Sequence, residues 1–317
     1  MKILYLTDLG YMGPLNMEFQ MGPRPPMSWI AALNSFHCPY PRLDELQEDN
    51  FDIAIIGCVH ENVDIFKINL EKIKSISKKI LFQHDSDHRY FYQKNSLQRS
   101  YMLNYIISNV DAILVHNDLD KKYYETLYKK SCFIHEQLIL DVYNENSTVD
   151  KHGVILGGIT DRYGALDGYT LITNSTDEEV YCFGAEENIP GINFIPNTWD
   201  YMEYNTKLSG FKYAFNLTPF AIGGSFPLQC AMMKVPCLGW DNSNPHKECF
   251  PDLVAPYGDF DSLREKFLHL INNKDFYNHT INYARDKFLN AFNINLYQTN
   301  LNKIFYDIIN NTNNNKK

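Results

Sequence analysis

The sequence has few of the features that mark membrane or secreted proteins. No apolar run approaches the about 18 residues that a membrane-spanning helix needs. The apolar start of the chain turns polar at Thr7 and Asp8, so it is too short for the core of a signal peptide and predicts a first buried strand. We therefore expect a cytoplasmic protein, or one that acts in the cytoplasm of a host cell if its source is viral.

The sequence also has few cysteines, and it has fewer basic than acidic residues. The 7 cysteines are an odd number and show neither a Cys-x-x-Cys pair nor the Cys/His spacing of a metal site, which predicts reduced thiols. The 29 lysines and arginines are outnumbered by 38 acidic residues, for a net charge of −9. Because affinity for DNA depends on neutralising phosphates, DNA is a possible partner that this charge disfavours.

What the chain does have is enough apolar sequence for two cores. Its 317 residues, 44% of them hydrophobic, fit either two domains or one large α/β domain. A polar stretch at residues 144–152 marks the expected linker. We predict a first domain over residues 1–145, a second over 152–295, and a C-terminal helix with a frayed, Asn-rich tail over 296–317.

Short apolar runs alternate with stretches of helical spacing along both halves. In the first half the runs are Lys2–Thr7, Asp52–Cys58, Lys79–Gln83 and Ala112–Val115; in the second they are Val154–Leu156, Glu179–Phe183, Phe211–Leu217 and Val235–Gly239. Continuous apolar strands with helices between them indicate parallel sheets covered on both faces. The predicted fold class is α/β, with two Rossmann-like, doubly wound parallel-sheet domains. Ligands of such sheets bind beyond the carboxyl ends of the strands.

A glycine-rich loop stands between a predicted strand and a predicted helix of the second half. Gly223 and Gly224 allow the backbone to approach a ligand closely, and Ser225 is a suitable N-cap. The unpaired N–H groups and the positive dipole at a helix start attract phosphate. The loop therefore predicts a phosphate site, with an ordinary turn as the alternative.

A cluster of ionisable side chains follows the third predicted strand. His84, Asp85, Asp87 and His88 lie within the run Gln83–Arg89. The cluster could supply a general base and hydrogen bonds to a substrate, with Asp85 or His84 acting. Two alternatives stay open: Asp85 and Asp87 could help to hold a divalent metal ion, or the whole loop could be a solvated surface.

Weaker candidates surround these two motifs. Arg162 could hold a diphosphate by bidentate contacts, and Glu186 could accept hydrogen bonds from a ribose. The loop Gly10–Gly13, which includes Tyr11 and Met12, could line a cleft from the first half. For each of them a plain loop or surface role is the alternative.

The run Phe211–Gly239 resembles the C-terminal core of GT-B glycosyltransferases, in which a strand leads through a glycine-containing loop to a helix and a buried strand. The helix of that family carries a Glu-Ala-Met-Ala-x-Gly-x-Pro-Val pattern. Gln229 takes the place of its glutamate, and Pro236 follows seven residues later, as in the pattern. Lys234 replaces the usual glycine, and Ala221 stands where retaining members carry another glutamate.

A second resemblance is to the α-glucosyltransferases of T-even phages, which glucosylate hydroxymethylcytosine in DNA. It rests on two short matches, Gln83-His84-Asp85 and Ser209-Gly210-Phe211-Lys212-Tyr213. This likeness implies one alternative function, the glucosylation of hydroxymethylated bases in DNA. A non-catalytic nucleotide-sugar-binding protein is another alternative.

The GT-B resemblance implies a hexosyltransferase-like enzyme that moves a sugar from a nucleotide-diphosphate donor to a hydroxyl acceptor, which is a glycan or a small molecule. The donor would lie between the halves, mostly on the second, and no metal ion or other cofactor would be required. The residues expected to bind it are Gly223, Gly224, Ser225, Gln229, Arg162 and Glu186. The acceptor side would include Gly10, Tyr11, Met12, Gly13, Asp87 and His88, with Asp85 or His84 taking the proton if the reaction inverts. The last helix, near Leu301–Ile309, would cross back to the first half.

Overall fold

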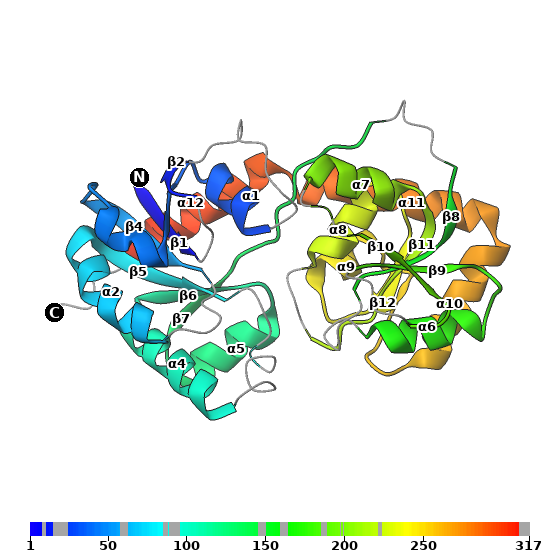
Figure 1. The fold of residues 1–317 in the computed structure, drawn as a ribbon, viewed down its shortest axis with the longest axis horizontal. Coiled ribbons are helices and arrows are strands. Elements are labelled where there is room, and N and C mark those ends of the chain that lie inside the picture. Colours follow the sequence, from blue (N-terminus) through cyan, green and yellow to red (C-terminus); the bar gives the residue numbers. More distant parts are fainter. Residues whose placement is uncertain are drawn as a thin grey trace. The chain divides into compact units, whose positions relative to one another are not determined.

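The computed structural model describes residues 1–7, 11–14, 25–57, 63–84, 88, 96–144, 150–158, 164–184, 189–196, 198, 200–220 and 224–310. The chain divides into two compact units (Figure 1). Unit 1 is formed by residues 1–20, 24–136 and 294–317, and unit 2 by residues 21–23 and 137–293. The chain therefore leaves unit 1 after Glu136 and returns to it at Ile294.

Unit 1 is built on a seven-stranded sheet with the strand order β2-β3-β1-β4-β5-β6-β7. Its strands are β1 (Ile3–Thr7), β2 (Gly13–Pro14), β3 (Phe36–Pro39), β4 (Phe51–Ile56), β5 (Ser77–Gln83), β6 (Ala112–Val115) and β7 (Ser131–Ile134). Neighbours pair in parallel, except for the antiparallel edge pair of β2 and β3. Side chains on both faces of β1 and β6 are buried, which explains why these strands are apolar throughout.

Helices cover both faces of this sheet. They are α1 (Pro25–Ala32), the 3-10 helix η1 (Tyr40–Glu45), α2 (Val63–Ile76), α4 (Ser96–Asn109), α5 (Asp118–Leu127) and α12 (Ile294–Asn310). In Figure 1, α1 and α12 lie on one side of the sheet, and α2, α4 and α5 lie on the other. Hydrogen bonds tie the return helix α12 to the rest of unit 1. Tyr297 Oη bonds to His135 Nε2 at 2.6 Å, and Gln298 Nε2 donates to the carbonyl of Ala32 at 2.6 Å.

Unit 2 is built on a six-stranded, wholly parallel sheet with the order β10-β9-β8-β11-β12-β13. Its strands are β8 (His152–Leu156), β9 (Val180–Phe183), β10 (Ile192–Ile195), β11 (Phe211–Asn216), β12 (Cys237–Trp240) and β13 (Val254–Ala255). Its helices are α6 (Ala165–Thr173), α7 (Tyr201–Ser209), α8 (Ser225–Met232), α9 (Asn244–Cys249), α10 (Phe260–Asn272) and α11 (Lys274–Ala291). Figure 1 shows α6 and α10 on one side of the sheet and α7 and α8 on the other.

The prediction of two doubly wound α/β domains is confirmed. The predicted strands of both halves correspond to β1, β4, β5, β6, β8, β9, β11 and β12, with ends that differ by one or two residues. The sequence analysis missed the strands β2, β3, β7, β10 and β13, which are two to four residues long. In unit 2 the strand order corresponds to 3-2-1-4-5-6, the order of dinucleotide-binding folds.

Each unit has its own hydrophobic core, and the described cysteines lie within these cores. Cys38 and Cys132 are buried in unit 1; Cys182, Cys230, Cys237 and Cys249 are buried in unit 2. Burial raises the pKa of Cys38 to about 11 and that of Cys132 to about 12, so both stay protonated near neutral pH. Within the described part of the chain, no helix is long and apolar enough to cross a membrane.

One buried amine predicts how the stability of unit 2 depends on pH. Lys151 Nζ, next to the start of β8, donates hydrogen bonds to the Lys234 carbonyl at 2.5 Å and to Tyr277 Oη at 3.3 Å. Burial, assisted by the positive charge of Lys234, lowers the pKa of Lys151 to about 8 from its ordinary value of 10.5. Between these two values the unfolded chain binds the proton and the folded chain does not, so stability rises with pH in this window.

We therefore expect Lys151→Met to remove this rise. From pH 8 to pH 9.5 the free energy of unfolding of the wild type should increase by about 1 kcal/mol relative to that of the variant. Urea denaturation followed by tryptophan fluorescence at several pH values measures the difference. Parallel pH dependences of the two proteins would show that the pKa of Lys151 is the same in the folded and the unfolded chain.

Candidate functional site

In unit 2 the strand order reverses between β8 and β11, and a doubly wound sheet binds its ligand in the crevice at such a point. The end of β8 lies close against the start of α8. Gly157 N donates to the carbonyl of Phe215 at 2.9 Å, and a Cβ added at Gly157 would lie 3.2 Å from the Phe226 ring and 3.4 Å from Asn216 Oδ1. Only a residue without a side chain fits here without displacing its neighbours.

The helix α8 starts at this same edge, directly after the glycine-rich loop. Gly224 occupies the N-cap position with φ +78°, and Ser225 is the first helical residue. The assignment of Ser225 as the N-cap is therefore wrong by one residue. The cap position here has a left-handed backbone, which glycine adopts readily and serine does not. A Cβ at Gly224 would also clash with Ser243 Oγ and lie 3.0 Å from the Pro245 side chain.

The N–H groups in the first turn of any helix have no carbonyl acceptor within the helix. The start of α8 therefore presents such unpaired backbone N–H groups. The adjoining loops are held by side chains from the end of β12. Trp240 Nε1 donates to the Leu217 carbonyl at 3.1 Å, and Asn242 Nδ2 donates to the Thr218 carbonyl at 2.8 Å. These hydrogen bonds hold the loops at this edge in place next to the start of α8. The N–H donors and the positive end of the helix dipole at this start favour the binding of an anion.

Two buried polar atoms at this edge have no hydrogen-bond partner among the described residues. They are Asn216 Oδ1, at the end of β11, and Ser243 Oγ, beside Gly224. Buried polar groups in native proteins nearly always have a partner, so both atoms are candidates for contact with a polar ligand. The sequence analysis missed them. A usable signal was present, because Asp241-Asn242-Ser243 comes one residue after the predicted strand Val235–Gly239.

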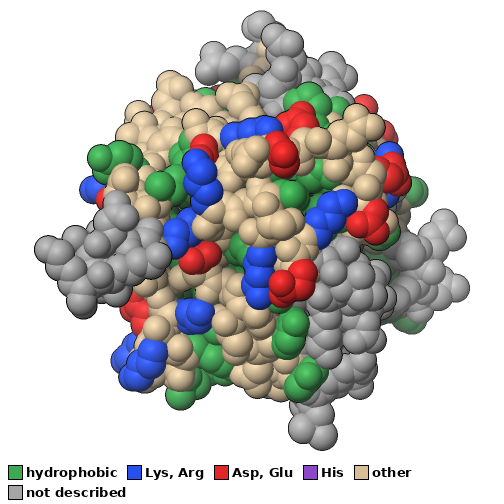
Figure 2. Space-filling model, turned by 90° about the vertical axis from the view of Figure 1, so that its left-hand side faces the viewer, with side chains coloured by type: hydrophobic (Ala, Val, Ile, Leu, Met, Phe, Trp, Pro, Cys, Tyr) green, Lys and Arg blue, Asp and Glu red, His purple; other side chains and the backbone are tan. Residues whose placement is uncertain are grey.

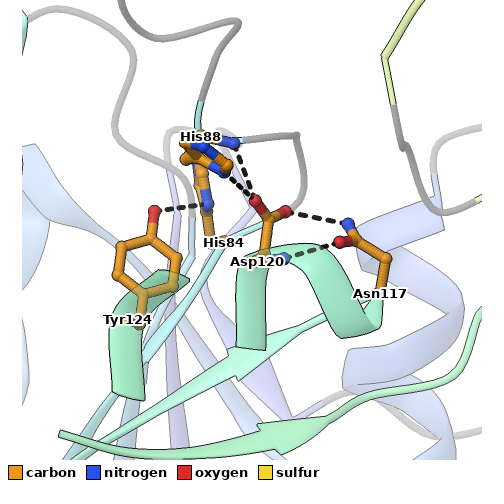
Figure 3. Close-up of polar contacts among 5 residues, drawn as sticks. All are labelled: His84, His88, Asn117, Asp120 and Tyr124. Atoms are coloured by element: carbon orange, nitrogen blue, oxygen red, sulfur yellow. Dashed lines mark hydrogen bonds and ion pairs between the residues drawn. The ribbon is translucent and has the colours of Figure 1, made fainter. Parts of the chain in front are cut away.

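A second polar cluster lies at the carboxyl ends of β5 and β6 in unit 1 (Figure 3). His84 follows β5 directly and is fully buried. Its Nδ1 shares a hydrogen bond of 2.8 Å with Tyr124 Oη on α5, and its ring stacks near Phe82. His84 is therefore fixed in place by α5.

The neighbouring His88 is bound to a buried carboxylate (Figure 3). Asp120 Oδ1 accepts a hydrogen bond from His88 Nδ1 at 2.5 Å and one from the backbone N–H of His88 at 3.0 Å. Asp120 Oδ2 accepts a third from Asn117 Nδ2 at 2.8 Å. Asn117 is also the N-cap of α5, where its Oδ1 accepts from the backbone N–H of Asp120 at 2.8 Å. The helix start and the carboxylate thus hold each other in place.

The sequence analysis selected His84 and His88 but missed their partners Tyr124, Asp120 and Asn117. The spacing of Asn117 and Asp120 offered a signal, because a capping residue followed three positions later by an acid marks a helix start. Nothing in the sequence links this helix start to His88, which lies 32 residues earlier than Asp120.

Two further buried histidines, which the sequence analysis left without a role, occupy the ends of β6 and β7. His116 Nδ1 donates to the His135 carbonyl at 2.6 Å, and both rings pack against Trp29. Burial, with a smaller contribution from the positive charge that His116 can carry, lowers the pKa of His135 well below its usual value. His135 is therefore a neutral member of the core near neutral pH.

The remaining predicted residues are distributed as follows. Gly13 forms part of the edge strand β2, and Tyr11 stacks near His37 on β3 with ring centroids 6.4 Å apart. Four strand positions separate β2 from β5, roughly 19 Å, so the structure does not bring Tyr11, Met12 and Gly13 to the cluster of His84 and His88.

Gln229 is buried on α8, in the same helix as Ser225. Gly10, Asp85, Asp87, Arg162, Glu186 and Gly223 lie outside the described residues. Among the residues that are described, no group of three or more His, Cys, Asp and Glu side chains is placed to hold a metal ion. The predicted metal ligands Asp85 and Asp87 are not among those residues.

Comparison with known proteins finds the same fold in solved structures. No family model matches the sequence, and no curated protein matches it. The structure of Staphylococcus aureus TarM with UDP superposes with a TM-score of 0.66 at 12% identity, over 84% of this chain and 58% of that one. Sucrose-phosphate synthase from Thermosynechococcus elongatus gives 0.68 at 10% identity, over 97% of this chain and 98% of that one.

The pneumococcal O-GlcNAc transferase GtfA, with UDP and GlcNAc, gives a TM-score of 0.65 at 10% identity, over 86% of this chain and 60% of that one. The chain thus spans about three fifths of the length of TarM and GtfA, and nearly all of the synthase. These structures are GT-B glycosyltransferases, so the GT-B fold expected from the sequence is confirmed.

Proposed function

We propose that the protein transfers a sugar from a nucleotide-diphosphate donor to a hydroxyl acceptor, which is a glycan or a small molecule, and that it needs no metal ion to do so. The observation that carries the proposal is the edge of unit 2 where β8, β11 and α8 meet. Gly157 and Gly224 let the end of β8 and the start of α8 pack closely against their neighbours there, and the N–H groups of the first turn of α8 point to the same edge.

The leaving group of such a transfer is a nucleoside diphosphate, on which negative charge develops as the sugar–phosphate bond breaks. Fixed N–H donors and a helix dipole stabilise that charge without a change of structure. We assign the diphosphate to the loop Gly223–Ser225, with Arg162 as a further cation. Asn216 Oδ1 and Ser243 Oγ are placed to contact polar groups of the donor, and Gln229 and Glu186 stay candidates for its ribose.

We assign the acceptor to the carboxyl edge of the sheet in unit 1, where the cluster of His84 and His88 lies. His84 is fully buried and bonded to Tyr124, which suits a residue that shapes the acceptor pocket. Asp85 stays a candidate for contact with the acceptor or the transferred sugar.

The charge distribution favours a glycan or small acceptor over DNA. Figure 2 shows acidic and basic side chains interspersed on the face it presents, not a continuous basic surface. Basic side chains on unit 1 are paired with carboxylates; these pairs include Lys72–Asp44, Lys78–Asp52 and Lys79–Asp111. Paired lysines release few counterions when a polyanion binds, which weakens the main source of DNA affinity.

A thermal-shift experiment tests the donor side of the proposal. The protein is mixed with UDP, GDP, ADP and CMP and with their common sugar derivatives, each with and without EDTA. UDP comes first because TarM and GtfA were solved with it. A ligand at 100 times its Kd adds about 2.7 kcal/mol of stability, which raises the melting temperature. We expect a shift with one nucleotide family that EDTA leaves unchanged.

Other results, from this experiment and from an assay of nucleotide release with added acceptors, contradict specific parts of the proposal. A shift that EDTA abolishes would replace the metal-free mechanism by one that uses Asp85 and Asp87. Tight binding without release of the nucleotide, in the presence of glycerol, maltose or a hydroxymethylated oligonucleotide, would indicate a binding protein and not an enzyme. Release only with the oligonucleotide would favour the modified DNA base as the acceptor.

A further inference from the structure

An open cavity of about 220 Å³ lies at the amino end of β11, at the edge of the unit 2 sheet opposite to the proposed donor site. It is lined by Lys212 and Tyr213 from β11, Leu270 and Ile271 from α10, and Lys274 and Tyr277 from α11. We propose that this cavity binds a small anion that carries a flat apolar ring, the class to which aromatic carboxylates belong. The proposal goes beyond sugar transfer and does not depend on it.

The walls of the cavity are fixed by contacts within unit 2. Tyr277 Oη donates a hydrogen bond to the Lys212 carbonyl at 3.1 Å, which joins the first turn of α11 to β11. The rings of Tyr213 and Tyr277 lie 5.9 Å apart with their planes at 85°, and Tyr213 packs in the same edge-to-face manner against Phe267, with 5.5 Å between centroids. The cavity is thus part of the folded unit, and no rearrangement is needed to form it.

The size and lining of the cavity favour a single ring. Liquid water occupies about 30 Å³ per molecule, so the cavity has room for roughly seven waters, well below the about 300–1,000 Å³ of sites for drug-sized ligands. Tyr213, Tyr277, Leu270 and Ile271 present aromatic and aliphatic carbon to this space. Tyrosine rings pack well against another ring in offset or edge-to-face geometry, which favours an aromatic ligand body.

Positive charge at the cavity favours an anionic group on that ring. Lys274 is exposed, and its Nζ has no carboxylate partner in the part of the chain that the structure describes. Because Lys274 is the first residue of the 18-residue helix α11, the positive end of the helix dipole lies at the same place. Lys151 Nζ lies 5.8 Å from the centroid of the Tyr277 ring, which adds a second ammonium group near the cavity wall.

The nearby carboxylates leave this positive charge in excess. Glu178 pairs with Lys212 at 2.7 Å, so these two groups largely cancel each other. Asp275 follows Lys274 and is the acidic residue in the first turn of α11. The cavity is thus flanked by three ammonium groups, including that of Lys151, and two carboxylates, which fits a ligand with a single negative charge.

The cavity is separate from the proposed donor site, although both lie along β11. Tyr213 precedes Asn216 by three residues, which corresponds to about 10 Å along a strand. A ligand with one ring, bound at the amino end of β11, therefore does not reach the start of α8. We expect it to bind together with a nucleotide and not in its place.

The test uses fluorinated probes, whose ¹⁹F relaxation reports binding to the intact protein. The probe 4-fluorobenzoate has both the ring and the charge, 4-fluorobenzyl alcohol has the ring alone, and inorganic phosphate, added as a competitor, has the charge alone. A hydrogen bond to a charged group is stronger than one between neutral groups, so we expect the Kd of the benzoate to be about tenfold or more below that of the alcohol. Neither a tenfold excess of phosphate nor saturating UDP should displace the benzoate.

Two variants locate the bound probe. Lys274→Gln keeps most of the side-chain stem and removes the charge, so it should raise the Kd of the benzoate by about threefold or more. Lys303→Gln, at an exposed lysine on α12, changes the net charge equally and should bind as the wild type does. Ile271→Trp places a large ring in the cavity and should abolish binding of the benzoate.

Several results would overturn the proposal. Equal affinities for the benzoate and the alcohol would show an apolar crevice without preference for an anion, and displacement by phosphate would show a general anion site. Displacement by UDP would place the probe at the donor site. Equal affinities in Lys274→Gln and Lys303→Gln would remove the cavity from the binding of the probe, a result that stands even if Ile271→Trp fails to fold. Absence of binding to the wild type at about 10 mM benzoate would also overturn it, whereas a wild type that binds the benzoate but no nucleotide would leave this site in place and overturn the proposed function alone.

Discussion

Replacing Gly224 by alanine should abolish measurable binding of the nucleotide donor. The φ of +78° puts the new side chain in a left-handed backbone, which costs about 1 kcal/mol or more. Its Cβ would also clash with Ser243 Oγ and crowd Pro245, so the start of α8 has to shift away from the end of β12. Hydrogen bonds to a charged phosphate contribute about 1.5–3 kcal/mol each, so losing even two of them weakens binding by about 100-fold or more.

Gly258 provides a matched control for this experiment. It has a similar φ of +87°, but a Cβ at this position meets no atom within 4 Å. Gly258→Ala therefore reproduces the backbone strain without the clash, and it should bind UDP as the wild type does while losing a comparable part of its stability. Calorimetry with UDP and denaturation curves for both variants separate the two effects. Equal affinities in Gly224→Ala and Gly258→Ala would remove the start of α8 from the donor site.

Replacing Asp120 by alanine should lower the stability of unit 1 by about 3–5 kcal/mol. The carboxylate is 1% exposed and accepts hydrogen bonds from the backbone and Nδ1 of His88 and from Asn117 Nδ2. Its removal leaves these donors without their acceptor in a buried place, where each lost partner costs about 1–3 kcal/mol. The helix α5 also loses the carboxylate that accepts a hydrogen bond from its N-cap residue, Asn117.

A surface pair shows how the same chemical change should behave where water can replace the lost partner. Asp44 pairs with Lys72 at 3.2 Å, and its side chain is 88% exposed. Asp44→Ala should change the stability by less than about 1 kcal/mol. Urea denaturation of both variants, followed by far-ultraviolet circular dichroism, measures the difference. If the two substitutions had the same small effect, the pair of His88 and Asp120 would be a hydrated surface contact.

How much of the fold the sequence reveals depends on the length of each strand. The strands β4 and β5 carry apolar runs long enough to be recognised as buried, and their parallel pairing follows from the helices between them. By contrast, β3 is four residues long and contains His37 and Pro39, whose polarity and backbone restriction are typical of loops. Its place in the sheet depends on pairing with β1, which is a tertiary contact and leaves no local signal.

The same distinction applies to the two parts of the site. The glycine-rich loop before α8 could be recognised because its glycines, its strand and its helix are adjacent in the chain. The contact of His88 with Asp120 could not, since it depends on β5 and β6 lying side by side and on the position at which α5 begins. Asn216 Oδ1 and Ser243 Oγ likewise lie at one edge of the sheet only because β11 pairs with β12.

The position of α12 has a consequence for the order in which the protein can be made. The sheet of unit 1 is complete once the ribosome has passed Ile134, but the helix that bonds to His135 and Ala32 begins only at Ile294. All of unit 2 is synthesised in between. The N-terminal unit, which folds first in most nascent multidomain chains, is here the one that must wait until residues 294–310 have been made. Until then, chaperones have access to the surface of unit 1 that α12 later covers, whereas unit 2 has every strand and helix it needs to fold.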